Sequence, residues 1–361
     1  MRYHDPQLKN GTITTKVVCA VCFLIFTFLW VYFFQADVLA IAQHTLSHGA
    51  THYDRTIGAV LITVVLMVLQ LVVHRFLRLD HRSHALTYVP SMLLLAFISD
   101  INADIDDHYS FGVWPWVLPV VLALWGGAIW LARQIDPFVN DEKMGTGLFS
   151  RCVWINLLQL VGMMLLVAAV GNTNAVFHHR AHAEMAMMNG DVDEVLRVGK
   201  RSAETDVTLT MLRANALARR GELGERLFEY PVVGTGDNLL PSFSHLQILP
   251  ADSIWHSLGA RPAFKMSAKH YFHCLERDSL ATSLVADYVL CAYLIDRDLE
   301  GFVRALPRYY NDTIKEVLPR YYREALDLYE QPRPSSTDQM FVDLERSMDT
   351  YWYYYYNHAT R

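Results

Sequence analysis

The sequence predicts an all-α protein: a five-helix transmembrane bundle followed by an extracytoplasmic α-helical repeat domain. Three observations carry this prediction. The first half holds long apolar stretches, basic side chains gather on alternate connections between them, and a window of the second half recurs at a helical-repeat period. The hydrophobic fraction is 52%, but the excess lies in the first half. We therefore expect a membrane domain over residues 1–175 and a helical domain over 176–361.

The longest uncharged stretch decides the organisation of the rest. Residues 154–171 read WINLLQLVGMMLLVAAVG, which is eighteen residues without a charge. At about 1.5 Å per residue this crosses a hydrocarbon core of about 30 Å. Pro90 interrupts a shorter segment, so a neighbouring helix has to cover the backbone carbonyl that the proline leaves free. The predicted membrane segments are residues 17–34, 57–73, 85–99, 113–132 and 154–171.

Charges flanking these segments predict the topology. Basic residues lie before the first segment and on the second-to-third and fourth-to-fifth connections: Arg2, Lys9, Lys16, Arg75, Arg78, Arg82, Arg133, Lys143 and Arg151. The opposite side carries Arg55 in its first loop, and its second loop, residues 100–112, has no lysine or arginine. The positive-inside rule then places the N-terminus in the cytoplasm. Five crossings deliver the second half to the far side, which in a bacterial inner membrane is the periplasm.

Composition also limits the function. A formal net charge of −6 argues against nucleic acid as a partner. The sequence has no G-x-S-x-G, H-E-x-x-H, P-loop or dinucleotide fingerprint, and no cofactor is predicted. Cys274 and Cys291 lie in the second half and could pair in an oxidising compartment, but their spacing does not decide it.

Two windows of the second half repeat. Ala183 and Gly190–Asp191 recur 31 residues later as Ala214 and Gly221–Glu222. A period in the low thirties is typical of helix-turn-helix repeats, in which a small residue allows close packing and a Gly-acidic pair makes the turn. A third window, from Asp287, fits more loosely because Arg297 stands where the turn glycine would be.

These windows resemble the tetratricopeptide repeat. In that pattern Ala183 and Ala214 match the small position of the first helix, and Val195 takes the place of the small residue of the second helix. The resemblance implies a domain that binds peptides or proteins in a concave face. Residues 234–262, between the windows, are rich in glycine, proline and serine and are predicted to form an ordered loop or a degenerate repeat.

The whole chain also resembles a family of uncharacterised multi-pass inner-membrane proteins of Bacteroidota. Its members carry membrane helices first, a repeat-like exterior domain last and a tyrosine-rich end. Here that end is an aromatic run with three alternative roles: a membrane anchor, a capping helix on the last repeat, or a partner-docking strip. The run is Tyr351, Trp352, Tyr353, Tyr354, Tyr355 and Tyr356.

An acidic loop is the sharpest candidate for chemistry. Alternating oxygen-bearing side chains resemble the start of a calcium loop, where hard oxygens surround a hard cation. Ile105 stands where such a loop needs glycine, and Phe111 stands at the closing bidentate position. The alternative is a solvated acidic loop. The candidate ligands are Asp100, Asn102, Asp104, Asp106, Asp107 and His108.

A run of histidines is expected on the same side of the membrane. His44, His48 and His52 are spaced by four residues, and on one helix they would share a face and hold a transition metal. Together with the aspartates they could form a mixed zinc or manganese site. Gly49 weakens that helix, and the alternative is a set of surface histidines on an interfacial helix.

Polar residues inside the predicted membrane segments are few. Gln70, Asn156 and Gln159 are expected to join helices by hydrogen bonds rather than to line a path.

Two functions follow as hypotheses. The first is a non-enzymatic inner-membrane scaffold or adaptor whose periplasmic repeat domain binds an envelope protein. The second is a metal-dependent membrane enzyme acting on a lipid-linked or glycan substrate at the outer leaflet, with the loop from Asp100 to His108 as its centre.

Overall fold

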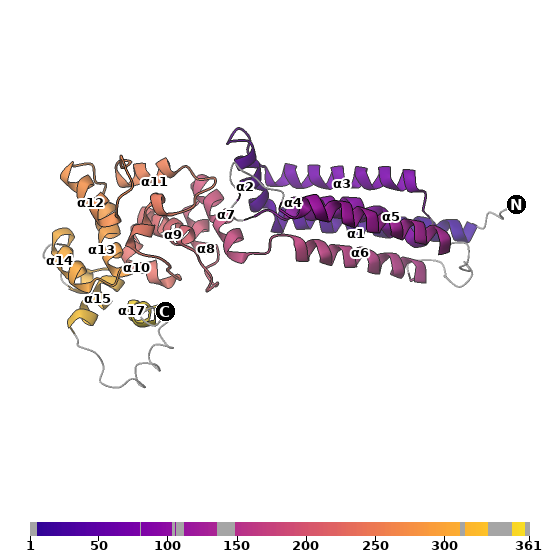
Figure 1. The fold of residues 1–361 in the computed structure, drawn as a ribbon. Helices are drawn as coiled ribbons and strands as arrows, with labels where there is room; N and C mark the ends of the chain where they lie inside the picture. Colours follow the sequence, from indigo (N-terminus) through magenta and orange to yellow (C-terminus); the bar gives the residue numbers. More distant parts are fainter. Residues whose placement is uncertain are drawn as a thin grey trace. The chain divides into compact units, whose positions relative to one another are not determined.

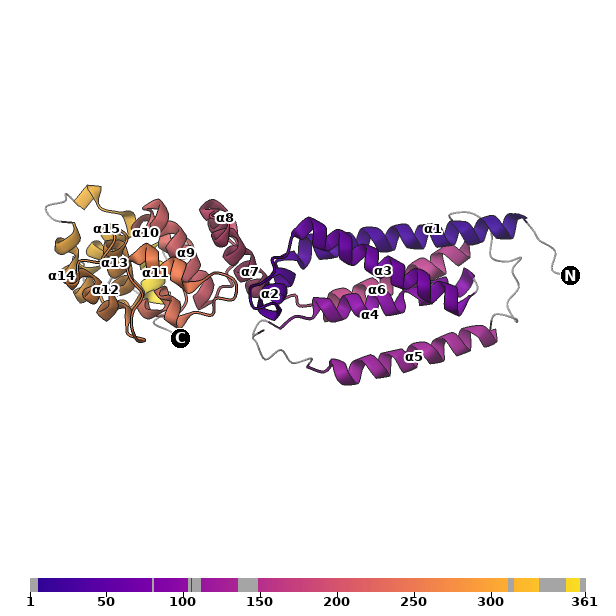
Figure 2. The same cartoon turned by 90° about the horizontal axis from the view of Figure 1, so that it is seen from above.

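The computed structural model describes residues 6–79, 81–102, 105, 112–135, 149–310, 315–330 and 349–357, and every regular element within these ranges is a helix. The chain divides into two compact units (Figures 1 and 2). The membrane unit is Met1–Asn174 and the C-terminal unit is Ala175–Arg361, close to the predicted boundary at residue 175.

Among the described residues of the membrane unit, four helices are long and apolar enough to cross a bilayer: residues Ile13–Phe34, Arg55–Leu77, Trp114–Ile135 and Arg151–Val170. The elements of this unit are α1 (Pro6–Leu29), the π-helix η1 (Trp30–Phe34), α2 (Ala36–Leu46), α3 (Arg55–Leu77), the 3-10 helix η2 (His81–Tyr88), α4 (Val89–Ser99), α5 (Trp114–Ile135) and α6 (Arg151–Val170). The predicted segment at residues 85–99 is not among these four long helices.

Pro90 explains why this segment is divided. Proline is tolerated in the first turn of an α-helix, and Pro90 lies there in α4. Upstream, the chain continues as the 3-10 helix η2. The carbonyl four residues before the proline, that of Leu86, accepts a hydrogen bond from the indole Nε1 of Trp125 on α5 at 2.8 Å. The expectation that a neighbouring helix covers this carbonyl is confirmed.

Hydrogen bonds define two ends of this bundle. At the end that we call proximal, the Ala85 amide donates to Asn156 Oδ1 at 2.7 Å, and Arg133 donates to the carbonyl of Leu77 at 2.9 Å. At the distal end, Trp30 Nε1 donates to Ser99 Oγ and the Asn172 amide donates to the Ser99 carbonyl, each at 2.9 Å. The combined segment η2–α4 therefore contacts both ends, and Figure 2 shows α4 among the long helices.

The C-terminal unit consists of short helices joined by tight turns. Its α-helices are α7 (Ala175–Met188), α8 (Val192–Arg197), α9 (Val207–Arg220), α10 (Leu223–Arg226), α11 (Ala251–Leu258), α12 (Ala268–Arg277), α13 (Val285–Ile295), α14 (Leu299–Tyr309), α15 (Arg320–Glu330) and α17 (Tyr351–Asn357). Its 3-10 helices are η5 (Leu227–Glu229), η6 (Gly236–Leu239), η7 (Pro241–Phe243) and η8 (Lys315–Val317).

The three predicted turns each join two helices. Gly190 and Gly221 have φ of +76° and +69°, which only glycine adopts without strain. Arg297 adopts φ of +58° at the third turn, and its guanidinium lies 5.2 Å from the ring centroid of Tyr354. This cation–π contact offsets part of the cost of the left-handed conformation, about 1 kcal/mol. Arginine can thus occupy the turn position of the glycine because its contact with Tyr354 stabilises the left-handed backbone.

The predicted small positions are in the core. Ala183, Ala214 and Val195 are all fully buried. The second helix of each early pair is short, with six residues in α8 and four in α10. The buried small positions therefore agree with the resemblance noted above, whereas these second helices are only about one to two turns long.

Helix α9 is enclosed on every side. Each residue from Thr208 to Ala218 is buried, and η6 packs against α9, α12 and α13. The amides of Val233 and His245 donate to the hydroxyls of Thr210 and Thr208 at 3.3 and 3.0 Å. Residues 234–262, predicted to be an ordered loop or a degenerate repeat, contain η6, η7 and α11, and their first part covers the face of α9 that an open repeat array would leave free.

The aromatic tail forms helix α17, which packs against α13 and α15. Tyr351 and Tyr354 are buried, and their hydroxyls donate to the carbonyls of Leu294 and Ile295 at 3.0 and 2.9 Å. The ring of Phe228 packs against both tyrosine rings in tilted arrangements. Of the three predicted roles, a capping helix agrees with these contacts. Tyr351 and Tyr354 are not available to a membrane or a partner, which corrects the prediction for those two residues.

Candidate functional site at the distal end of the membrane unit

The predicted histidines lie near the distal end but not on one helix face. Helix α2 ends at Leu46, so it carries His44 and not the other two. His48 lies in a turn with φ of +51°, followed by Gly49 at +78°. The rings of His44 and His52 stack with centroids 6.4 Å apart. The glycine that weakened the predicted helix thus ends it, and the chain doubles back.

The acidic loop begins at the same end. The carboxylate of Asp100 accepts a hydrogen bond from Trp114 Nε1 at 2.8 Å, and this bond ties the end of α4 to the start of α5. Four predicted ligands, Asp104, Asp106, Asp107 and His108, lie outside the described residues. Within the described ranges no three His, Cys, Asp or Glu side chains converge as a metal site would require. The metal hypothesis stays a prediction.

An apolar cavity of about 370 Å³ adjoins Asp100 and Trp114. This volume lies within the range of small-molecule pockets, about 300–1,000 Å³. Three helices form its walls, and all of their lining residues beyond this polar mouth are apolar. Examples are Val89, Met92 and Ala96 on α4, Val117 and Val121 on α5, and Met163 on α6.

The cavity exists because α5 packs loosely. In its most apolar eighteen-residue window 6% of residues are buried, against 22–28% in the other three spans. Three hydrogen bonds tie it to the bundle: Trp114 to Asp100, Trp125 to the Leu86 carbonyl, and Arg133 to the Leu77 carbonyl. Helix α5 is thereby held at both ends and in the middle. Between these hydrogen bonds the small side chain of Ala96 on α4 leaves space.

Polar side chains inside the bundle connect its elements. Gln70 Nε2 donates to Thr87 Oγ1 at 2.9 Å, and Ser91 Oγ donates to the Leu66 carbonyl at 2.8 Å. Asn156 accepts from the Ala85 amide and donates to the Cys152 carbonyl at 2.9 Å. The predicted joining role is confirmed for Gln70 and Asn156. Gln159 differs, since its side chain is exposed on α6.

Sequence analysis missed the buried charges of the C-terminal unit. Glu184 is fully buried, and one carboxylate oxygen, Oε2, accepts the amides of Gln247, Ile248 and Leu249 at 2.9, 2.7 and 3.2 Å. Burial raises the pKa of this carboxyl, and the three N–H groups oppose that rise. In the sequence, Arg180 and Glu184 have the i,i+4 spacing of an ordinary exposed ion pair, so the sequence does not reveal that Glu184 is buried.

Arg213 is the second buried charge. Its guanidinium donates to the carbonyls of Val198 and Gly199 at 3.1 and 3.2 Å and lies 5.2 Å from the ring centroid of Tyr230. Burial lowers the pKa of Arg213 to about 10. The signal that could have found it is an arginine within the apolar run TLTMLRANALA. It fixes the loop after α8 and has no exposed surface for a ligand.

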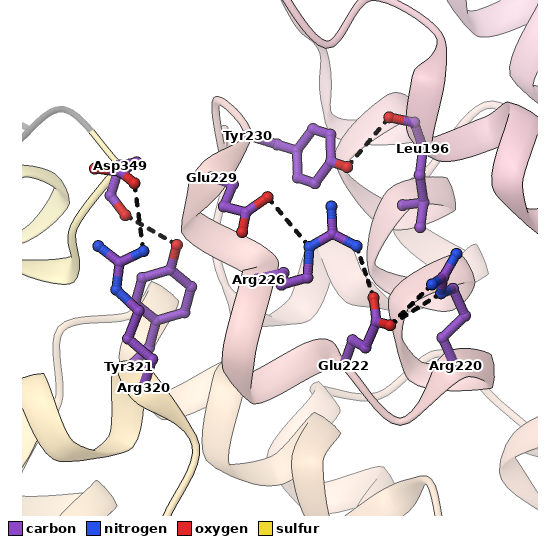
Figure 3. A network of polar contacts seen from close by, with 9 residues as sticks. All are labelled: Leu196, Arg220, Glu222, Arg226, Glu229, Tyr230, Arg320, Tyr321 and Asp349. Carbon is purple, nitrogen blue, oxygen red and sulfur yellow. Dashed lines mark hydrogen bonds and ion pairs between the residues drawn. The ribbon is translucent and has the colours of Figure 1, made fainter.

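The predicted turn residue Glu222 anchors a surface network of ion pairs (Figure 3). Its carboxylate contacts Arg220 at 3.0 Å and Arg226 at 2.7 Å, and Arg226 also pairs with Glu229 at 3.2 Å. Arg220 reaches Asp193 on α8, so the network joins the first two helix pairs. Exposed pairs of this kind contribute about 0–1 kcal/mol each, and we read the network as structural.

Cys274 and Cys291 are free thiols in this structure. Cys291 is fully buried in α13, and its sulfur lies 3.7 Å from the hydroxyl of Tyr322.

Comparisons with known proteins found no match to the chain among protein-family models, curated proteins or solved structures.

Proposed function

We propose that this protein is an inner-membrane scaffold of a bacterium, whose C-terminal unit lies in the periplasm and binds an envelope protein. The proposal joins a topology with a binding role. The observation that carries the topology is the segment η2–α4, which supports a fifth crossing of the bilayer.

The apolar part of η2–α4 is long enough for a short crossing. From Ala85, after the kink at Ser83, four residues rise by about 2.0 Å each and the eleven residues of α4 by about 1.5 Å each, or about 24 Å together. A hydrocarbon core of about 30 Å accommodates a segment this short by thinning locally. The Ala85 amide donates a hydrogen bond at the proximal end and the Ser99 carbonyl accepts one at the distal end, which supports the same interpretation. A fifth crossing makes the total odd.

The charge distribution supports the orientation. Described basic residues near the proximal end are Lys16, Arg75, Arg78, Arg82, Arg133 and Arg151. Arg55 lies at the distal end, where its Nε donates to the Tyr32 carbonyl at 2.7 Å. By the positive-inside rule the proximal end is cytoplasmic, and the chain leaves α6 on the opposite side.

A binding role for the C-terminal unit rests on its helix-turn-helix pairs and on its exposed apolar side chains. The enclosed face of α9 argues against peptide binding along that helix. The partner then contacts the exterior, where Phe264 and Leu280 are 66% and 52% exposed. Exposed apolar side chains anchor protein interfaces where they form part of a larger apolar patch.

Reporter fusions test the topology. Alkaline phosphatase fused after Arg361 is expected to be active, and the same enzyme fused after residue 140 is expected to be inactive, because phosphatase folds only outside the cytoplasm. Green fluorescent protein should give the opposite pattern. An inactive phosphatase and a fluorescent protein after Arg361 would mean an even number of crossings and would refute the periplasmic assignment.

Photocrosslinking in living cells tests the binding role. Benzoylphenylalanine placed at Phe264 or Leu280 should capture one reproducible envelope protein, whereas the same probe at the exposed Lys200 should not. Capture of no protein at either apolar position, with the fusions behaving as expected, would leave the topology intact and reject the scaffold role.

A further inference from the structure

The cavity between α4, α5 and α6 is as deep as one leaflet of a bilayer. Its mouth is formed by Asp100 and Trp114 at the distal end, and its floor reaches Val89. From Val89 to Asp100 the rise along α4 is about 16 Å, at about 1.5 Å per residue. Half of a hydrocarbon core is about 15 Å. The cavity therefore extends from the interface to the middle of the membrane.

Its lining residues open sideways to the bilayer. Val113 on the approach to α5 and Leu166 on α6 both line the cavity and are each 65% exposed. A molecule entering from this side comes from the hydrocarbon region and not from water. Such a cavity has the walls for an acyl chain, because an apolar chain neither needs nor satisfies hydrogen-bonding groups there.

The mouth selects the headgroup by charge. Asp100 carries a carboxylate at the interface, and it is the one charged side chain among the described residues that line the cavity. The distal Arg55 is engaged with Tyr32, over whose ring its guanidinium lies at 5.0 Å. A negative mouth attracts an ammonium group and repels an anionic headgroup.

We propose that this cavity binds the acyl chain of an aminophospholipid, with its ammonium group at Asp100. The lipid belongs to the leaflet at the distal end. This inference depends on the membrane unit being in a bilayer and not on which leaflet faces the cytoplasm.

Lipid photolabelling of the full-length protein tests the site. Vesicles would contain phosphatidylethanolamine with a diazirine in the acyl chain, and the adducts would be mapped by mass spectrometry. We expect adducts at Met163 and Val117 to exceed those at Val64 by about fivefold. Val64 is a matched lipid-facing position on α3, 52% exposed. Equal labelling at both places would mean ordinary annular lipid and would overturn the proposal.

Two substitutions from opposite walls should fill the cavity. Val121→Trp on α5 and Ala96→Phe on α4 should each reduce the adducts at Met163 about fivefold. Val120→Trp is the control, because Val120 neighbours Val121 but is 59% exposed and does not line the cavity. Unchanged labelling of Met163 in a folded filling variant would refute the site.

The headgroup is tested by a matched probe. Phosphatidylglycerol with the same diazirine chain should label Met163 about threefold less than phosphatidylethanolamine. Asp100→Asn should remove this difference while keeping the hydrogen bond from Trp114, since an amide oxygen also accepts. Equal labelling of the wild type by both lipids would reject the role of Asp100.

Discussion

Both units bury polar side chains against irregular backbone, but they use different chemistry. In the membrane unit, Asn156 accepts a hydrogen bond from the Ala85 amide and Trp125 donates one to the Leu86 carbonyl, both on η2. In the C-terminal unit, Glu184 holds the amides of Gln247 to Leu249, and Arg213 holds the carbonyls after α8. The first set is uncharged and the second is ionisable, although the membrane unit also buries Arg82 and His84 within η2 itself.

The solvent explains this difference. A charge inside a hydrocarbon core costs at least about 2.5–3.5 kcal/mol, so neutral amide and indole groups satisfy the backbone there. In a unit surrounded by water, a carboxylate that accepts three N–H groups forms stronger, charge-assisted bonds. The comparison predicts that removing a buried charge costs more than removing a buried neutral group.

The largest effect is expected for Glu184→Ala. Three buried amides lose their acceptor, which should destabilise the C-terminal unit by about 3 kcal/mol. Pulse proteolysis of the full-length protein and hydrogen exchange at residues 247–249 would measure it. Glu184→Gln should cost about 1 kcal/mol, because its amide oxygen can take the place of Oε2. The exposed Glu300→Ala is the control, and equal losses in Ala and control variants would contradict the prediction.

A smaller loss is expected for Asn156→Leu in the membrane unit. The Ala85 amide loses its acceptor in an apolar setting, which should cost about 1–2 kcal/mol. Unfolding in mixed micelles would measure it. Gln159→Leu on the exposed face of the same helix is the matched control and should change stability little. If Gln159→Leu lowered the free energy of unfolding more than Asn156→Leu, the proposed difference between buried and lipid-facing polar groups would be wrong.

Trp125→Phe should cost still less, about 0.5–1 kcal/mol, because it removes one hydrogen bond and keeps most of the ring. The same unfolding assay applies, with Trp130→Phe as control, since Trp130 is 63% exposed on α5. If both variants behave alike, the Leu86 carbonyl does not need Trp125.

The smallest effect concerns pH. Burial, and then the nearby Arg213, lower the pKa of His179. The unfolded chain therefore binds a proton more readily than the folded unit, so stability is full above about pH 6.5 and is lost as pH falls toward the lowered pKa. His179→Phe should flatten this dependence, and a slope unchanged by the substitution would exclude His179 as its source.

Local patterns predicted much of this fold. The turn glycines, the small packing positions and the long spans follow from residue type and spacing, as at Gly190, Gly221 and Ala214. The division at Pro90 followed from its missing amide, although the 3-10 helix before it did not. What sequence could not supply depends on distant contacts: Glu184 resembles a surface carboxylate until residues 247–249 reach it.

The candidate site was predicted less completely. Asp100 was singled out for its oxygen ligands, whereas its observed partner is Trp114, which lies fourteen residues away in sequence. The cavity beside it arises from the weak packing of α5, and no motif encodes that. His44, His48 and His52 had the right spacing for one helix face, but the turn at Gly49 separates them.

The enclosure of α9 has a consequence for folding. Solenoids tolerate loss of a terminal repeat because each unit touches only its neighbours. Here η6 reaches α9, α12 and α13 together, and a side chain on Gly236 would come within 2.8 Å of the Ala292 carbonyl. Truncation that removes α12 and α13 should thus also destabilise η6 and α9 instead of only shortening an array.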